Sequence, residues 1–228
     1  MNGLELFIAV SLGIGLAAAS GFRIFIPPFL YGIAARLEYL PSAIPTSGLQ
    51  DWMASDIGLV VLGLATLVEI AAYYVPWLDN LLDTIASPAA MISGVLLMSS
   101  SLGESDPLLR WGLSIIAGGS VSGLVQGSTV ALRAMSTATT GGLGNPVVST
   151  AEAGGCVICT ILAVLLPIIT LVLVIVGIGF NLIKSPNIPN YPTTNLLEIT
   201  NQKVNKKKFV KELKITFEKF LSKYYKTS

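Results

Sequence analysis

Long apolar stretches alternate with short polar ones along this chain. A helix of about 17–25 mostly apolar residues is long enough to cross a bilayer. The pattern therefore predicts an all-α, polytopic transmembrane bundle of five to six segments. It leaves open whether Ala86–Leu102 spans the membrane or re-enters it. The apolar stretches are residues 4–20, 24–37, 57–75, 86–102, 108–131 and 157–183.

A charged residue and two prolines separate the first apolar stretch from the second or lie just within the second. Arg23 follows the first stretch, and two prolines, Pro27 and Pro28, lie just beyond. Proline lacks the backbone donor and clashes with the preceding turn, so one straight helix through this point is not expected. We predict a short unwound turn at Ser20–Pro28 between two helices, followed by a polar extramembrane loop at Glu38–Ser55.

The second half carries a similar irregular segment. Serine, threonine and glycine dominate between Arg133 and Gly155, and no apolar run there is long enough to span. We therefore predict a second broken helix at Thr137–Pro146. Val157–Ile183 is expected to form a single span that tolerates Pro167, as membrane helices can. The small-residue stretch Leu108–Ala131 is expected to form a central helix, because small residues allow close helix packing in lipid.

Composition supports a membrane solvent. The chain is 53% hydrophobic and 12% charged, with a mean hydropathy of +0.74. A soluble domain carries about 25% charged residues because its surface faces water. This chain has too little polar surface to cover a soluble globule.

Charge divides the chain into a body and a tail. Residues 1–202 hold five basic and eleven acidic side chains (net −6), whereas residues 203–228 hold nine lysines and two glutamates (net +7). We expect a transmembrane domain at 1–184, a Pro/Asn-rich linker at 185–202 and a basic amphipathic helix at 203–228. Basic loops stay in the cytoplasm, so the C-terminus is expected there, as for a bacterial inner-membrane protein. Anionic lipid is the expected partner of this basic tail.

Several chemistries are not expected. The chain has no histidine, which removes the usual metal ligand and general base. Cys156 and Cys159 stand three residues apart, but no second cysteine pair exists to relay electrons. We interpret both as buried small side chains rather than as a thiol enzyme's site. No catalytic residue, metal, cofactor or nucleic-acid partner is expected.

Four charges lie within or beside apolar segments: Arg23, Glu69, Arg133 and Glu152. Each would cost about 2.5–3.5 kcal/mol at the bilayer centre, so such residues usually face the bundle interior and pair. We expect Arg23 to pair with Glu69, and Arg133 with Glu152. Charges beside broken helices are typical of solute or ion sites. The alternative is that they only fix helix packing.

The segment between these last two charges has no charged side chain from Met135 to Ala151. Glycines there permit backbone conformations that gather amides or carbonyls into an ion site, and an ordinary surface loop is the alternative. Asp79 and Asp83, four residues apart, form a secondary candidate that is also typical of solvated helix caps. The candidates in the segment are Thr139, Thr140, Gly141, Gly142, Gly144 and Asn145.

A faint internal echo links the two halves. Residues 10–15 resemble residues 113–118, which would give a weak inverted repeat if an odd number of crossings lies between them. We also consider a homodimer that uses the small-residue face of Leu108–Ala131.

Three motifs together resemble the bacterial and plastid membrane proteins grouped as domain of unknown function 4126. They are Ala19–Arg23 with Pro27-Pro28, Glu69 with Pro76–Asp83, and Ser136–Ser149 with Glu152. The resemblance covers about residues 1–183 and implies a polytopic membrane protein without supplying a substrate. Our first hypothesis is a small transporter or channel for an unidentified solute or ion. The alternative is a non-transporting scaffold or lipid-binding protein whose basic tail recruits a partner.

Overall fold

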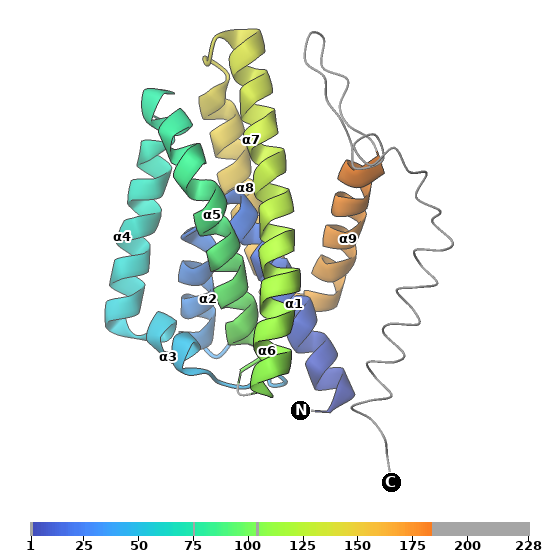
Figure 1. Cartoon of the computed structure of the whole chain (residues 1–228). Helices are drawn as coiled ribbons and strands as arrows, with labels where there is room; N and C mark the ends of the chain where they lie inside the picture. The colour runs from blue at the N-terminus through green and yellow to red at the C-terminus, as the bar shows by residue number, and fades with distance from the viewer. Residues whose placement is uncertain (1, 75, 104, 184–228) are drawn as a thin grey trace. The chain divides into compact units, whose positions relative to one another are not determined.

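The computed structural model describes residues 2–74, 76–103 and 105–183, without the side chains of residues 76–84 and 180–183. These residues form helices and turns, with no strand among them. Figure 1 shows their course. In chain order the helices are α1 (Gly3–Phe22), α2 (Ile26–Arg36), α3 (Gly48–Ala54), α4 (Asp56–Ala72), α5 (Pro76–Ser101), α6 (Pro107–Leu113), the π-helix η1 (Ser114–Gly119), α7 (Ser120–Thr140), α8 (Asn145–Leu165) and α9 (Pro167–Ile183).

The chain divides into two units, residues 1–178 and 179–228. The predicted linker at 185–202 and the basic tail at 203–228 lie outside the described residues. The first unit holds the helices as far as most of α9.

Three of the described helices are long and apolar enough to cross a membrane: Gly3–Phe22, the continuous run Pro107–Thr140, and Asn145–Leu165. The bent pair α3–α4 makes a fourth if its two helices, which meet at 72°, count as one span. Ile85–Ser101 and Pro167–Gly179 are apolar but shorter. The all-α membrane bundle is therefore confirmed, with a broken span among its segments.

The predicted break after the first helix is present. α1 ends at Phe22, Arg23 is extended (φ −147°, ψ 137°), and α2 begins at Ile26. Pro27 and Pro28 occupy the first turn of α2, where a missing backbone donor costs nothing because those N–H groups have no partner within the helix. The prolines therefore start the second helix rather than bend the first.

The Glu38–Ser55 segment is more ordered than a loop. It contains α3, which packs on α2 and buries Gln50 and Met53. Ser55 ends α3 and starts α4, and its hydroxyl accepts a hydrogen bond from the amide of Gly58 at 3.1 Å. A serine cap of this kind fixes where the second helix begins.

Ala86–Leu102 forms the second part of α5, except for its last residue. This helix runs from Pro76 to Ser101 and includes the motif segment Pro76–Asp83 as its first part. Pro88 is accommodated inside this helix.

The expectation of one span over Val157–Ile183 is wrong. α8 begins earlier, at Asn145, and ends at Leu165, while α9 starts at Pro167. Leu166 has non-helical backbone angles (φ −137°, ψ 60°). Proline disfavours the helical conformation in the residue before it and suits a helix's first position, which accounts for the separation of two helices at Pro167.

Small residues bring the central helices into close contact. A Cβ atom on Gly21 would lie 2.5 Å from Cβ of Val125 and 2.6 Å from the carbonyl oxygen of Ser122, so α1 crosses α7 at backbone distance. Gly94 and Gly118 make a similar crossing between α5 and η1. The central position expected for Leu108–Ala131 is not confirmed, because 22% of the span that holds this stretch is buried compared with 56% of α1.

The two segments of the internal echo lie on helices that run in the same direction. Gly13 and Gly118 both pack against Met98, and further along the same helices Gly21 packs against Ser122. This pair of segments therefore does not by itself give an inverted repeat.

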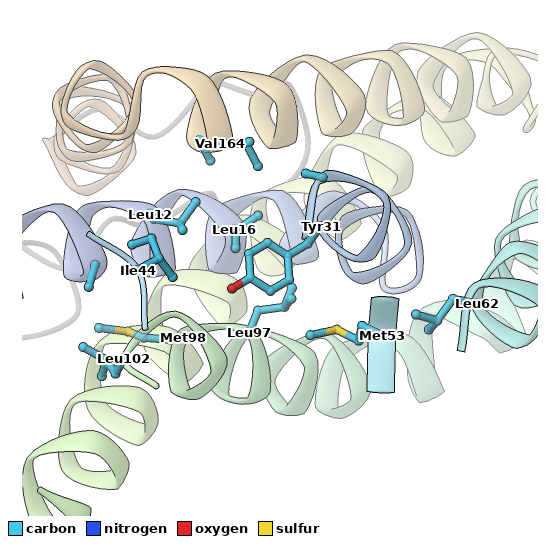
Figure 2. Close-up of a cluster of buried hydrophobic side chains, with 13 residues drawn as sticks. Leu12, Leu16, Tyr31, Ile44, Met53, Leu62, Leu97, Met98, Leu102 and Val164 are labelled. Atoms are coloured by element: carbon cyan, nitrogen blue, oxygen red, sulfur yellow. The ribbon is translucent and has the colours of Figure 1, made fainter. Parts of the chain in front are cut away.

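An apolar cluster joins side chains of several helices, among them α1, α2, α3, α5 and α8. Figure 2 shows Leu12, Leu16, Tyr31 and Leu97 among its members. Because lipid is as apolar as these side chains, such a cluster is stabilised by close packing rather than by exclusion of water.

Polarity is distributed as in a protein that lipid surrounds. Both Arg23 and Arg133 are buried, whereas one face of α4 exposes large apolar side chains. A surface of this kind requires an apolar solvent, so the protein is membrane-embedded. The exposed side chains of α4, each between 59% and 73% exposed, are Ile57, Val60, Leu64, Leu67 and Val68.

Candidate functional site

The four intramembrane charges converge beside the break between α1 and α2. Arg23 comes from the break itself, Glu69 from α4, Arg133 from α7 and Glu152 from α8. All four side chains are between 1% and 7% exposed. We call these four residues the charge cluster.

Glu152 is the shared carboxylate of the cluster. Nε of Arg133 donates to Oε1 and Oε2 of Glu152, each at 3.1 Å, and Nη2 of Arg133 forms an ion pair with Oε2. Nη2 of Arg23 lies 3.3 Å from the same Oε2. The predicted Arg133–Glu152 pair is therefore confirmed, but the carboxylate serves two guanidinium groups instead of one.

The predicted Arg23–Glu69 pair is wrong. Oε1 and Oε2 of Glu69 accept hydrogen bonds from the backbone amides of Ile24 at 2.8 Å and Phe25 at 3.0 Å. These amides have no partner within a helix, because α1 stops before them. They lie at the start of α2, where a negative charge is favourable. Glu69 thus caps the broken helix rather than binding the arginine.

Arg23 instead reaches α8. Its Nη2 donates to the carbonyl oxygen of Ser149 at 3.0 Å and to the Ser149 hydroxyl at 2.5 Å. Nε and Nη1 of Arg23 are buried and donate no hydrogen bond within the described part of the chain. A buried donor without a partner is costly, so this arginine has binding capacity that the resting fold does not use.

Tyr73 completes the site, and sequence analysis missed it. The guanidinium carbons of Arg23 and Arg133 lie 3.8 Å and 4.1 Å from the centre of its ring. A desolvated cation over an aromatic ring is stabilised by about 2 kcal/mol. Tyr73 follows Glu69 by four residues on α4, so helical spacing from that glutamate was the signal that could have found it.

A polar column leads from the charge cluster to the α7–α8 turn. Asn145, Ser149 and Glu152 lie on one buried face of α8, and Asn145 exchanges hydrogen bonds with the Thr137 hydroxyl. Arg133 and Ser136 lie on the facing stripe of α7. Glu152 is seven residues into α8, which places it about 10 Å along the helix from the turn.

The second break lies within the predicted range Thr137–Pro146 but is shorter than expected. α7 continues through Thr140, and only Gly141–Gly144 form a turn before α8. Gly141 and Gly142 have positive φ (64° and 91°), which ends α7 as glycine often does. Figure 1 shows this turn at the far end of α7, so it does not meet the first break in the interior.

The hydroxyls of Thr139 and Thr140, near this turn, are exposed and already used. Thr139 and Thr140 bond to carbonyl oxygens of their own helix, and the Thr140 hydroxyl also accepts from the Gly144 amide at 2.9 Å. Of the candidates in this segment, only Asn145 is buried. The others form the outer end of the polar column.

The remaining candidates stand apart from the charge cluster's chemistry. Cys156 and Cys159 are free thiols that donate to the carbonyl oxygens of Ala19 and Gly15 on α1, at 3.3 Å and 3.6 Å. They serve α1–α8 packing. The side chains of Asp79 and Asp83 lie outside the described part of the chain.

An apolar cavity of about 280 Å³ opens on the other side of the break. Phe25, Trp52, Leu62 and Leu96 are among its lining residues. The hydroxyl of Ser93, also in the lining, donates to the carbonyl oxygen of Ile24 at 3.1 Å. The break therefore separates an apolar cavity from the charge cluster.

Fold and site together define a polytopic helical membrane protein with buried charges at a broken helix. The chain belongs to the family described as domain of unknown function (DUF4126), whose model matches residues 10–185. That range includes the whole charge cluster and the α7–α8 turn. No curated protein and no solved structure matches the chain.

Proposed function

We propose that this protein is a small membrane transporter or channel whose solute path passes the charge cluster. The observation that carries the proposal is the convergence of two arginines and two glutamates on the α1–α2 break inside a membrane bundle. Charges at membrane depth are costly and mark solute paths, and irregular backbone there is tolerated where it lines a cavity or is buried in protein.

The polar column supports the same proposal. It provides hydroxyl and amide groups between the exposed α7–α8 turn and Glu152, and they can replace the water that a solute loses on entry. On the other side, Glu69 holds the amides of the break, so its release would free them. In this proposal the path runs from the α7–α8 turn along the polar column to the α1–α2 break, and the turn and the break are the parts that move.

The finer assignments belong to this proposal as well. The lysine-rich tail supports a cytoplasmic C-terminus in a bacterial plasma membrane and contact with anionic lipid. A homodimer through the α6–α7 region fits its small residues. The protein is proposed to act without enzymatic chemistry.

Solute flux into proteoliposomes tests the proposal. We expect purified protein to carry at least one solute of a panel of inorganic ions, protons and small organic acids. A chain ending at residue 202 should carry it equally well, because the path lies in the body. The absence of flux from correctly inserted protein would favour the scaffold hypothesis, in which the tail recruits a partner.

A further inference from the structure

The charge cluster offers hydrogen-bond donors rather than acceptors. Both carboxylate oxygens of Glu69 accept backbone amides, and both oxygens of Glu152 accept from Arg133. The cluster atoms without a hydrogen-bond partner in the described residues are Nε and Nη1 of Arg23. A cation would meet carboxylates that already hold donors and would be repelled by two neighbouring guanidinium groups, whereas an acceptor group meets two donors that have no partner.

The distribution of charges in the cluster also favours a negatively charged group. Arg23 and Arg133 share the single carboxylate of Glu152. The Glu69 carboxylate is held separately by the two amides at the start of α2. A guanidinium group stays protonated at any physiological pH, so the side of the cluster that faces α8 carries an excess positive charge.

The approach along α7 and α8 suits a negatively charged solute. No charged side chain occurs from Met135 to Ala151 that would repel or trap it. The hydroxyl of Ser136, only 9% exposed, has no hydrogen-bond partner among the described residues. A Cβ atom on Gly144 would lie 2.6 Å from that hydroxyl oxygen, so the free donor lies beside the turn. Unused donors therefore lie at both ends of the column.

We propose that the solute is an anion, or carries an anionic group, which enters along the polar column and accepts a hydrogen bond from Nε or Nη1 of Arg23. This inference rests on the proposed transport function and adds the charge class of the solute. Arg133 holds Glu152 in place, and Glu152 positions Arg23. Nε and Nη1 lie on different edges of the planar guanidinium, so each can donate a separate charge-assisted hydrogen bond to a carboxylate, nitrate or phosphate oxygen.

The sign of a diffusion potential tests the charge class. Proteoliposomes are loaded with a high concentration of sodium chloride, nitrate, acetate or phosphate and diluted into low salt, and a voltage-sensitive dye reports the lumen. Anion efflux makes the lumen positive, whereas sodium efflux makes it negative. Because electroneutral exchange gives no potential, exchange of the radiolabelled anions and of radiolabelled sodium is measured in the same vesicles.

A positive lumen, or exchange of a labelled anion, supports the inference. A negative lumen, or exchange of labelled sodium alone, overturns it and leaves the transport function standing. No potential and no exchange with any of these probes contradicts both.

Two variants of Arg23 test the donor geometry. Arg23→Ala should abolish anion passage. Arg23→Lys keeps the charge but loses the two unused guanidinium nitrogens, so we expect anion passage to fall at least tenfold. Arg36→Ala is the matched control, because Arg36 pairs with Asp56 at the exposed surface. Wild-type anion passage by folded Arg23→Ala protein, with native elution and melting behaviour, would overturn the inference.

Discussion

At the scale of single residues, the site depends on the sharing of one carboxylate by two arginines. Each guanidinium also lies over the ring of Tyr73, so Glu152 and Tyr73 together hold the positive charges in place. Burial makes every member of such a network costly to remove, because the remaining charges lose their partner in a medium that solvates them poorly.

The two ends of the Arg133–Glu152 pair are therefore not equivalent. Glu152→Gln leaves two guanidinium groups without a carboxylate and should cost about 3–5 kcal/mol, as for a broken buried ion pair. Arg133→Gln should cost less, because Glu152 still interacts with Arg23. Thermal unfolding in detergent measures the order of the two variants. A lower melting temperature for Arg133→Gln than for Glu152→Gln would contradict the shared-carboxylate arrangement.

Sequence predicted the members of the charge cluster but only part of its pairing. Arg23, Glu69, Arg133 and Glu152 were identifiable because lipid excludes charge. Pairing depends on which helices pack together: Arg23 reaches α8 because α1 packs against α8, and no local pattern encodes that contact. The same is true of the Gly-rich segment, where composition predicted a break but not that its turn lies at the exposed end of α7.

At the scale of helices, the α1–α2 break depends on Glu69. Its carboxylate satisfies two amides that the interrupted helix leaves without partners. Thr66 and Tyr73 share the buried face of α4 with it. α4 thus presents a polar stripe to the break and an apolar face to lipid.

Removal of the Glu69 carboxylate should loosen the break without unfolding the bundle. In Glu69→Ala the amides of Ile24 and Phe25 lose their acceptor, so their hydrogen exchange should accelerate relative to the wild type. Exchange followed by mass spectrometry on peptides covering residues 20–30 measures this, and the peptides of α8 serve as an internal control. Unchanged exchange at Ile24 and Phe25 would show that Glu69 does not hold the break.

Close helix crossings make a second prediction at this scale. Gly21→Ala places a methyl group 2.5 Å from Val125 and should destabilise the bundle by about 1–3 kcal/mol, as overpacking does. Gly127→Ala meets no atom within 4 Å and should be neutral or stabilising by up to about 1 kcal/mol from helix propensity. Melting temperatures in detergent compare the pair; equal values would contradict the α1–α7 crossing.

Helix boundaries show where sequence reasoning stops at this scale. Pro27 and Pro28 correctly indicated a break, because two successive prolines remove two backbone donors and clash with the preceding turn. Pro167, in a purely apolar context, was taken to be tolerated within one span, yet it begins a new helix. Hydropathy alone does not distinguish a tolerated proline from a separating one, because both occur in membrane helices.

At the scale of the molecule, the described bundle buries its four intramembrane charges and exposes many large apolar side chains, which places it in lipid. Within that bundle the polar column and the charge cluster are separated by only a few turns of helix from the exposed α7–α8 turn. A path for a solute therefore needs movement of a turn and a break, rather than a change in the whole fold. The cluster is the point that such a path has to pass.

Flux through proteoliposomes that contain Arg23→Ala, compared with wild type and Arg36→Ala, tests this claim most directly. Arg23 and Arg36 each pair with a carboxylate, but only Arg23 is buried at the break. The account predicts that wild type and Arg36→Ala carry the same solute at similar rates and that Arg23→Ala carries none. Equal flux through all three folded and inserted proteins would show that the solute path does not pass the charge cluster.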